Sequence, residues 1–206
     1  MRTSSFLSRL NPSQPSEEII LSPEIHLILL HHPVVNKRGE IVSTAVTNLD
    51  IHDNARSART FGLTSYHIVT PLDAQVELVS RILKHWKEGF GARRVPNRVD
   101  AMDLVQVSRS LEEAMGTIMG DREGKPVVVS TCARKRDQVV SFSEMRERIG
   151  SEQGPFVLVF GTGYGLAEEV LASSDAVLAP IGDPDDWNHL SVRGAVAIIL
   201  DRLLGR

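Results

Sequence analysis

The 206-residue sequence contains a single cysteine, Cys132, and therefore cannot form an intrachain disulfide. This excludes a disulfide-stapled scaffold and fits a reducing compartment, so we expect a cytoplasmic protein. No apolar run approaches the roughly 18 residues that suggest a membrane span, so we expect no membrane partner. Aromatic residues are scarce at 5%, but hydrophobic residues reach 42% and charged residues 24%, the proportions of an ordinary globular protein.

The sequence also has little net charge. It contains 23 Lys and Arg residues and 26 Asp and Glu residues, which gives a net charge of −3. The charges are nevertheless unevenly spread along the chain. Segment 150–206 is acidic, whereas 81–98 is strongly basic and 134–136 is a second basic cluster. Basic clusters are often only solvated faces, but these two favour a surface that meets a polyanion.

The first 23 residues lack apolar periodicity and are rich in Ser, Pro, Asn and Gln, as flexible tails are. They also lack the apolar centre of a signal peptide. From residue 24 onward, apolar runs alternate with helical patterns, and no internal repeat is visible. We therefore expect a tail over 1–23 and one domain over 24–206.

Five continuous apolar runs, at 24–31, 66–70, 125–131, 155–160 and 176–180, predict strands. Helical spacing predicts helices at 50–62, 98–119, 141–149, 166–173 and 191–204, and one that follows a capping box at 70–73 and ends near Gly89. Strands that are apolar throughout indicate an α/β fold with a parallel sheet covered by helices on both faces. Chemistry is then expected in the loops after the strands.

The loop 160–166 reads Phe-Gly-Thr-Gly-Tyr-Gly-Leu and follows a predicted strand. Its glycines allow a ligand to approach the backbone closely and leave amides free to donate, although a plain tight turn explains them too. Dinucleotide-binding loops follow the first strand of their fold, whereas only 41 residues remain after Gly165. An unrelated nucleotide-binding enzyme therefore fits poorly.

Two further segments carry clustered polar residues. In 180–193, which leads into the last helix, Asn188 or Ser191 can cap that helix. In 47–62, Asp50 can cap a helix, with Arg56 and Arg59 simply solvated. The spacing of the histidines at 31, 32 and 52 fits no standard metal site, so we expect no metal.

Taken together, these segments resemble the SPOUT superfamily of RNA methyltransferases. The stretches that carry the likeness are RSARTFG at 56–62, FGTGYGLAEEVL at 160–171 and NHLSVRGAVAIILDRLLG at 188–205. More closely, residues 24–206 resemble an SPOUT subfamily of bacterial proteins described as similar to tRNA guanine-N1 methyltransferases. This sequence departs from ribose methyltransferases of the superfamily, which usually have a Glu between the glycines of the second motif, where Gly163 stands here.

The resemblance implies a C-terminal trefoil knot, which pattern analysis alone would not propose because knots are rare. It also implies a homodimer, with which the apolar last helix is consistent. The cofactor that it implies is S-adenosylmethionine, held in three loops by Thr131, Cys132, Phe160, Gly161, Thr162, Gly163, Gly165, Pro180, Ile181, Asn188, Leu190 and Ser191.

Methyl transfer from a sulfonium mainly requires positioning of the two reactants and a more reactive acceptor. We predict Arg56 as the catalytic residue, because a guanidinium can stabilise a developing negative charge. The candidates for positioning the substrate are Arg59, Asn48, Asp50 and Asp53, and an Asp would suit removal of a guanine N1 proton. Arg56 slightly favours a ribose 2′ oxygen over guanine N1 as the acceptor.

The expected substrate is tRNA or rRNA. A non-catalytic RNA-binding or ribosome-assembly factor that retains the knotted fold is the alternative. It is motivated by the altered second motif and by the third, where Asn188 and Ser191 are separated by two residues instead of the usual one. The residues predicted to face RNA are Arg59, Arg81, Lys84, Lys87, Arg93, Arg94, Arg98, Arg134, Lys135 and Arg136.

Overall fold

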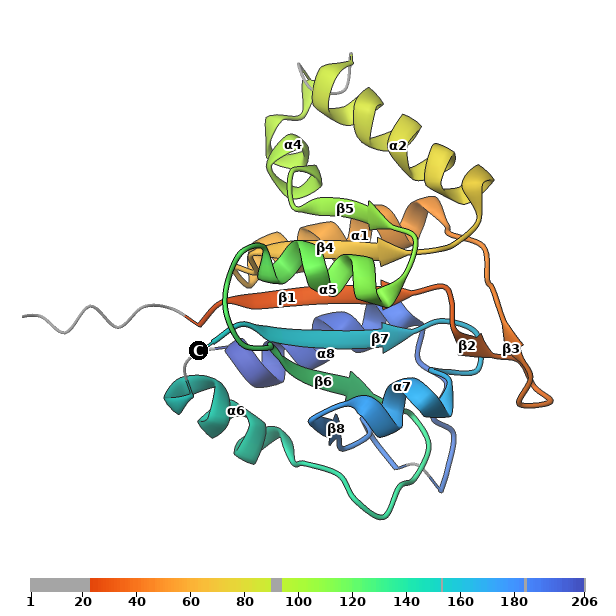
Figure 1. The fold of residues 1–206 in the computed structure, drawn as a ribbon, viewed down its shortest axis with the longest axis vertical. Helices are drawn as coiled ribbons and strands as arrows, with labels where there is room; N and C mark the ends of the chain where they lie inside the picture. Colours follow the sequence, from red (N-terminus) through yellow and green to blue (C-terminus); the bar gives the residue numbers. More distant parts are fainter. Residues whose placement is uncertain (1–22, 90–93, 153, 184, 206) are drawn as a thin grey trace, which may run out of the picture.

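The computed structural model describes residues 23–89, 94–152, 154–183 and 185–205. Almost all of the predicted tail and Arg93 lie outside these residues. Six parallel strands form one sheet in the order β5-β4-β1-β7-β6-β8 (Figure 1). Their bounds are β1 Ile25–Leu30, β4 Ser65–Val69, β5 Val105–Ser108, β6 Val127–Thr131, β7 Phe156–Gly161 and β8 Ala176–Leu178.

A short antiparallel hairpin, β2 Val34–Val35 with β3 Ile41–Val42, follows β1. The helices of the described residues are α1 Asn48–Thr60, α2 Asp73–Glu88, α4 Pro96–Met102, α5 Leu111–Met119, α6 Phe142–Ser151, α7 Glu168–Ser173 and α8 Val192–Leu204.

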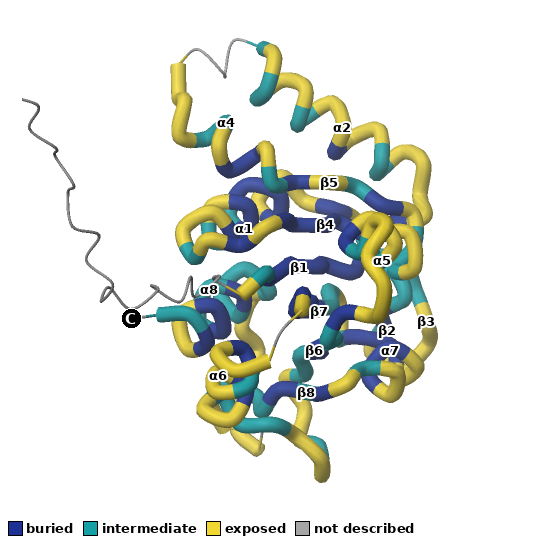
Figure 2. Tube along the Cα trace, turned by 60° about the vertical axis from the view of Figure 1, so that its left-hand side comes forward, coloured by how far each residue is buried: buried dark blue, intermediate teal, exposed yellow. Residues whose placement is uncertain are grey.

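Both faces of the sheet are covered, which confirms the predicted architecture. Along β1, Leu27 and Leu29 pack with α1, α6 and α8, whereas Ile28 and Leu30 pack with α5 and α7 on the other side. This explains why the strands are apolar at every position rather than at every second one. Figure 2 shows the buried strands in the centre, while α2 is mostly exposed or intermediate and contributes Val79 as its buried residue.

The predicted helix over 98–119 is wrong. The segment contains α4, then β5, then α5. Strand β5 forms because its backbone pairs with β4 at the edge of the sheet, a long-range contact that outweighs local helical spacing. Ser110 begins α5 by accepting a hydrogen bond from the Glu113 N–H at 3.2 Å, a Ser-x-x-Glu signal that marks this boundary in the sequence.

The predicted capping box at 70–73 is also wrong. Helix α2 begins after Leu72, which offers no side chain to cap it, and Pro71 lies before the helix. Two other caps follow the sequence directly: Ser141 and Glu144 form a capping box on α6, and Ser191 accepts a hydrogen bond from the Gly194 N–H on α8.

The candidate site at the ends of three strands and along α1

Three loops lie together at one edge of the sheet. Strands β7, β6 and β8 are parallel neighbours, so the segments that follow Gly161, Thr131 and Leu178 emerge at the same edge. The Thr131 hydroxyl donates to the Val159 carbonyl at 3.1 Å across two of these strands. Sheet topology therefore brings to one edge the three loops in which the predicted cofactor residues lie.

The glycine loop after β7 is braced by the β2–β3 hairpin. The Tyr164 N–H donates to the Val35 carbonyl at 3.0 Å, and the Val35 N–H donates to the Gly165 carbonyl at 2.9 Å. Both the N–H and the hydroxyl of Thr162 donate to the Leu30 carbonyl. The expectation that the loop amides are free is therefore wrong for Thr162, Tyr164 and Gly165, whose N–H groups already have partners in the chain.

The glycines of this loop have distinct structural roles. A Cβ at Gly161 would come within 2.7 Å of the Leu166 N atom, so the turn closes too tightly for any side chain. Gly163 and Gly165 have φ angles of +62° and +108°, which disfavour other residues. At Gly165 a Cβ would meet no atom within 4 Å, so there is open space beside its Cα, and the positive φ rather than crowding favours glycine here.

The loops after β6 and β8 are joined by polar contacts. The Asn188 amide donates to the Ala133 carbonyl at 2.9 Å, and Lys135 pairs with Asp185 at 2.6 Å. Asn188 therefore ties two loops together, while the helix cap belongs to Ser191. These contacts hold the edge of the sheet in one arrangement.

Arg136 makes a two-pronged ion pair with Glu168 of α7, with one of its contacts at 3.0 Å. The hydrogen bonds from Arg136 hold the pKa of Glu168 below its usual range. Glu168 in turn raises the pKa of Arg136. Much of the positive charge of the 134–136 cluster thus faces acids of the same chain, and Arg134 is the exposed remainder.

The residues at this edge fit the cofactor implied by the resemblance. Ile181 is half-buried against the core and Leu190 is exposed, and Gly182, next to Ile181 in the chain, has open space where a Cβ would lie. A flat heterocycle with polar edges needs that combination of apolar cover and backbone polar groups. The chemistry of the loops thus suits the adenine of S-adenosylmethionine.

Helix α1 carries the predicted catalytic residues. Its N-cap Thr47 forms a capping box with Asp50, whose carboxylate accepts from the Thr47 hydroxyl at 2.6 Å. Arg193, at the start of α8, lies 3.5 Å from Asp50 and 3.3 Å from Asp53. Asp50 is 5% exposed, so it serves the helix start and an ion pair, whereas Asn48, Arg56 and Arg59 are exposed.

Buried polar groups anchor α1 to the sheet. The Tyr66 hydroxyl donates to the Asp50 carbonyl at 3.1 Å and lies 3.3 Å from the Asn54 amide nitrogen, which donates to it. Tyr66 is fully buried, and burial raises the pKa of its phenol above the usual range. The position of α1 beside β4 is therefore set by hydrogen bonds as well as by apolar packing.

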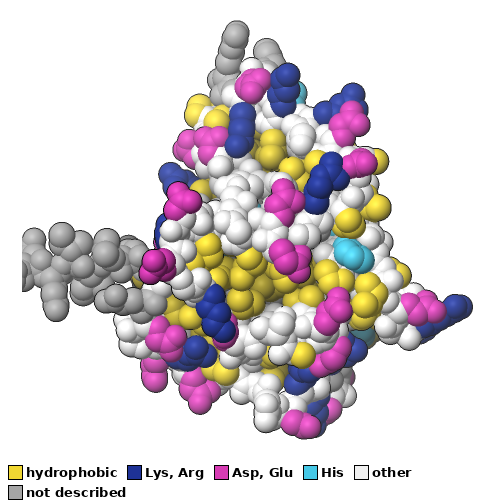
Figure 3. Space-filling view, viewed as in Figure 1, with side chains coloured by type: hydrophobic (Ala, Val, Ile, Leu, Met, Phe, Trp, Pro, Cys, Tyr) yellow, Lys and Arg dark blue, Asp and Glu magenta, His cyan; other side chains and the backbone are white. Residues whose placement is uncertain are grey.

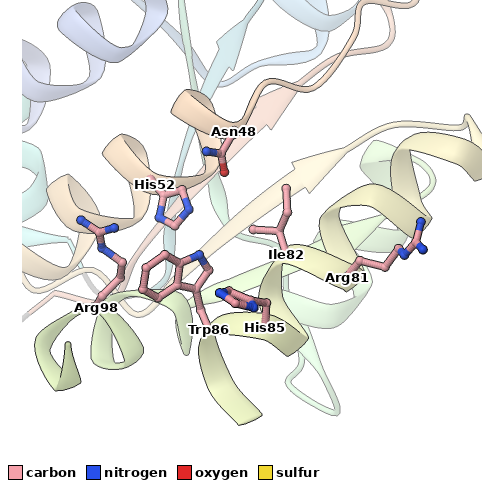
Figure 4. Close-up of a pocket in the computed structure, with 7 residues that line it drawn as sticks. All are labelled: Asn48, His52, Arg81, Ile82, His85, Trp86 and Arg98. Atoms are coloured by element: carbon pink, nitrogen blue, oxygen red, sulfur yellow. The ribbon is translucent and has the colours of Figure 1, made fainter. Parts of the chain in front are cut away.

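A pocket of about 380 Å³ lies on the flank of α1 that faces α2 and α4 (Figure 4). In the sequence, Trp86 continues the apolar stripe of α2 formed by Val76, Val79 and Leu83, whereas no local pattern marks His52 and His85 as pocket residues. We call this the Trp86 pocket; it is lined by Asn48, His52, Arg81, Ile82, His85, Trp86 and Arg98. Three of the predicted site residues, Asn48, Arg81 and Arg98, meet here.

Some of the other basic residues of segment 81–98 lie next to acidic side chains. Lys87 lies 3.4 Å from Asp103, and Arg81 lies 3.7 Å from Glu77, whereas Lys84 is exposed. On the face drawn in Figure 3, Lys and Arg side chains over α2 and α4 are interspersed with acidic ones. This face is therefore not a continuous basic surface.

The histidines of the described residues do not form a metal site. This part of the chain contains no group of three or more His, Cys, Asp or Glu side chains placed to hold a metal ion. His31 lies 3.0 Å from the Thr44 hydroxyl, and His52 lies against Trp86. No helix within the described ranges is long and apolar enough to cross a membrane.

Comparison with known proteins identifies the family of this chain. A family model described as SAM-dependent RNA methyltransferase matches residues 24–205. A protein of Aquifex aeolicus without a functional name is 38% identical over 91% of this chain and 92% of its own length. A tRNA (guanine-N(1)-)-methyltransferase of Oleidesulfovibrio alaskensis is 42% identical over 88% of this chain, which corresponds to only 42% of that protein.

Solved structures share the fold. A probable methylase family protein of Haemophilus influenzae superposes with a TM-score of 0.59 at 21% identity, covering 89% of this chain and 66% of that one. Its likeness concerns the fold alone. With the family match over nearly the whole described domain and the three motif loops at one sheet edge, the chain belongs to the SAM-dependent RNA methyltransferases of the SPOUT superfamily.

Proposed function

We propose that this chain methylates tRNA, with S-adenosylmethionine as the methyl donor and N1 of a guanine as the acceptor. The observation that carries the proposal is the convergence of three motif loops at one sheet edge in a chain of this family. Arg56 by itself favours a ribose 2′ oxygen, but the name of the Oleidesulfovibrio relative favours guanine N1. Because the chain spans less than half of that relative, the activity must be tested on this chain alone.

S-adenosylmethionine, when bound, supplies a methyl group that is already activated as a sulfonium. We assign its binding to the loops after β6, β7 and β8, with the half-buried Ile181 as apolar cover. The chain must then position the guanine and accept its N1 proton. Arg56, exposed on α1, stabilises the negative charge that the base gains as the proton leaves.

Asp53 is better placed than Asp50 to accept that proton. Both carboxylate oxygens of Asp50 are engaged, one by Thr47 and the other by Arg193. The side chain of Asp53 is 46% exposed and has one oxygen paired with Arg193. We therefore assign proton acceptance to Asp53 and a structural role to Asp50, with Asn48 at the exposed start of α1 as a positioning residue.

The trefoil knot and the homodimer remain proposals. Helix α8 is the last element of the chain, yet it packs against α1, α6 and β7, as a threaded C-terminal helix must. Most of its apolar stripe, including Val196, Ile199 and Leu203, is buried within the chain, and Leu204 packs against the same core, so Ile198 is the large apolar side chain of α8 left for a partner copy. Analytical ultracentrifugation tests the dimer, and an experimental structure traces the path of α8.

For RNA, we propose Arg59, Arg81, Lys84 and Arg98 as the primary contacts on α1, α2 and α4. Lys135 and Arg136 are already paired with Asp185 and Glu168, so they contribute less free charge. Binding to RNA should weaken steeply with salt, because each neutralised phosphate releases counterions. The single cysteine keeps the cytoplasm as the predicted compartment.

The test incubates the purified chain with S-adenosylmethionine and unmodified tRNA, followed by mass spectrometry of the digested nucleosides. The expected product is 1-methylguanosine, and a 2′-O-methylated nucleoside contradicts the acceptor assignment. RNA binding without any methyl incorporation favours the non-catalytic assembly factor instead.

Two variants test the roles of the α1 residues. Arg56→Ala should abolish methyl transfer while calorimetry shows unchanged affinity for S-adenosylmethionine. Asp53→Asn should lower kcat, whereas Asp50→Asn should lower the thermal midpoint because it removes the capping carboxylate and an ion-pair partner. An Asp53→Asn protein with full kcat contradicts the proton-acceptor assignment.

A further inference from the structure

We infer that the Trp86 pocket binds an unpaired nucleotide of the RNA that flanks the methylated one. This inference rests on the proposed function, because it names how the same enzyme holds its RNA. The pocket volume of about 380 Å³ lies within the roughly 300–1,000 Å³ range of small-ligand sites. Its lining combines one large aromatic ring, two guanidinium groups and two imidazoles, drawn from three helices (Figure 4).

The indole of Trp86 provides a stacking platform. The guanidinium carbon of Arg98 lies 4.7 Å from the Trp86 ring centroid, and the His52 and His85 rings meet the indole edge to face at 5.2 Å and 5.4 Å. The guanidinium plane of Arg98 thus covers part of the indole, and an incoming base stacks on that plane or takes its place on the ring. Proteins that recognise unpaired RNA commonly combine aromatic and guanidinium planes in this way.

His52 presents a polar atom without a partner at this site. The residue is only 9% exposed, and its Nδ1 atom has no hydrogen-bond partner among the described residues. Burial, with the positive charges of Arg98 and Arg56, lowers the pKa of His52, so the ring is neutral at pH 7. A neutral imidazole offers one donor and one acceptor, which matches the mixed polar edge of a base.

The charges around the pocket suit a phosphate. In the described part of the chain, no carboxylate lies within ion-pair distance of Arg98, whose recorded contact is the Trp86 ring. Arg81 is 78% exposed at its side chain and has only a loose i,i+4 contact with Glu77 at 3.7 Å, an interaction of little strength in water. Both guanidinium groups are thus available to a nucleotide whose base enters the pocket.

The pocket adjoins the residue to which we assign charge stabilisation. Asn48, His52 and Arg56 follow at intervals of four residues, which places them along one flank of α1. Arg56 therefore lies one helical turn beyond His52, roughly 6 Å along the axis. A nucleotide held against Trp86 is therefore a neighbour of the guanine that lies at Arg56. Because it anchors the RNA and takes no part in methyl transfer, its loss should affect KM rather than kcat.

A direct binding test uses tryptophan fluorescence. The chain has two tryptophans, so Trp187→Phe leaves Trp86 as the sole reporter. A short single-stranded RNA should quench this fluorescence, and a blunt RNA duplex of the same sequence should not. Absence of quenching, or equal quenching by both, overturns the inference. This measurement involves no methyl transfer. If the RNA quenches the fluorescence but the chain shows no methyl transfer, the proposed function is refuted and the pocket assignment stands.

A kinetic test uses matched variants. Trp86→Ala should raise KM for tRNA by about 5-fold to 150-fold, the range for loss of one base stack. Trp86→Phe should lie between Trp86→Ala and the natural chain, which controls for folding. Arg98→Gln should raise KM, whereas Arg202→Gln should not, although Arg202 lies over the Phe142 ring at a similar 4.8 Å. A fall in kcat at unchanged KM, or equal effects of the two arginine variants, overturns the inference.

Discussion

Two buried histidines, His67 in β4 and His31 directly after β1, should make this fold lose stability in mild acid. His31 is 0% exposed and His67 is 1% exposed. Burial lowers the pKa of each from 6.5 to about 4, and the neighbouring His26 further lowers that of His67. His31 Nε2 and His67 Nδ1 also have no hydrogen-bond partner among the described residues. Both rings are therefore neutral when folded at pH 7.

Proton linkage determines whether the free energy of unfolding rises or falls with pH. Between pH 6.5 and pH 4 the unfolded chain binds protons at these positions and the folded chain does not, so the free energy of unfolding falls as the pH falls. Each group with a pKa of about 4 folded and 6.5 unfolded costs about 2 kcal/mol between pH 7 and pH 5. His31 and His67 together cost about 4 kcal/mol, much of the stability of a typical domain.

Urea unfolding followed by circular dichroism at pH 7, 6 and 5 measures how the free energy of unfolding changes with pH. His67→Gln should lower stability at pH 7 but lose about 2 kcal/mol less than the natural chain on acidification to pH 5. His31→Gln should behave in the same way. His189 is exposed, so His189→Gln serves as the control and should lose as much stability between pH 7 and pH 5 as the natural chain. Stability that is flat from pH 7 to pH 5, or an unchanged slope in both buried variants, refutes the reasoning.

Three substitutions probe the packing around the site. Tyr66→Phe should lower the free energy of unfolding by about 1–3 kcal/mol in urea titrations, because it leaves the buried Asn54 amide and the Asp50 carbonyl without their partner. An unchanged free energy of unfolding contradicts the anchoring role of this hydroxyl. Gly161→Ala should cost about 1–3 kcal/mol by the same assay and weaken S-adenosylmethionine binding in calorimetry, since its Cβ would overlap Leu166; normal affinity argues against the loop assignment. Ser191→Ala should cost about 1 kcal/mol through loss of the α8 cap, and a neutral result shows that the cap is dispensable.

Local signals in the sequence determined much of the fold. Each predicted strand exists, because a segment of five or six apolar residues must be buried on both faces whatever surrounds it. Ser141 and Ser191 begin helices as predicted, since a cap needs only a side chain and an amide three residues away. The motif residues of three distant segments were also recognisable, because their chemistry depends on residue type and spacing.

The tertiary structure decided what depends on partners far away in the sequence. Strand β5 exists because β4 lies beside it, and the glycine-loop amides are occupied because the hairpin at Val35 reaches them. The basic run at 134–136 loses much of its free charge to Asp185 and Glu168, acids that lie more than thirty positions away. The Trp86 pocket arises only where three helices meet, since hydrogen bonds, ion pairs and cavities form between surfaces that only the folded chain brings together.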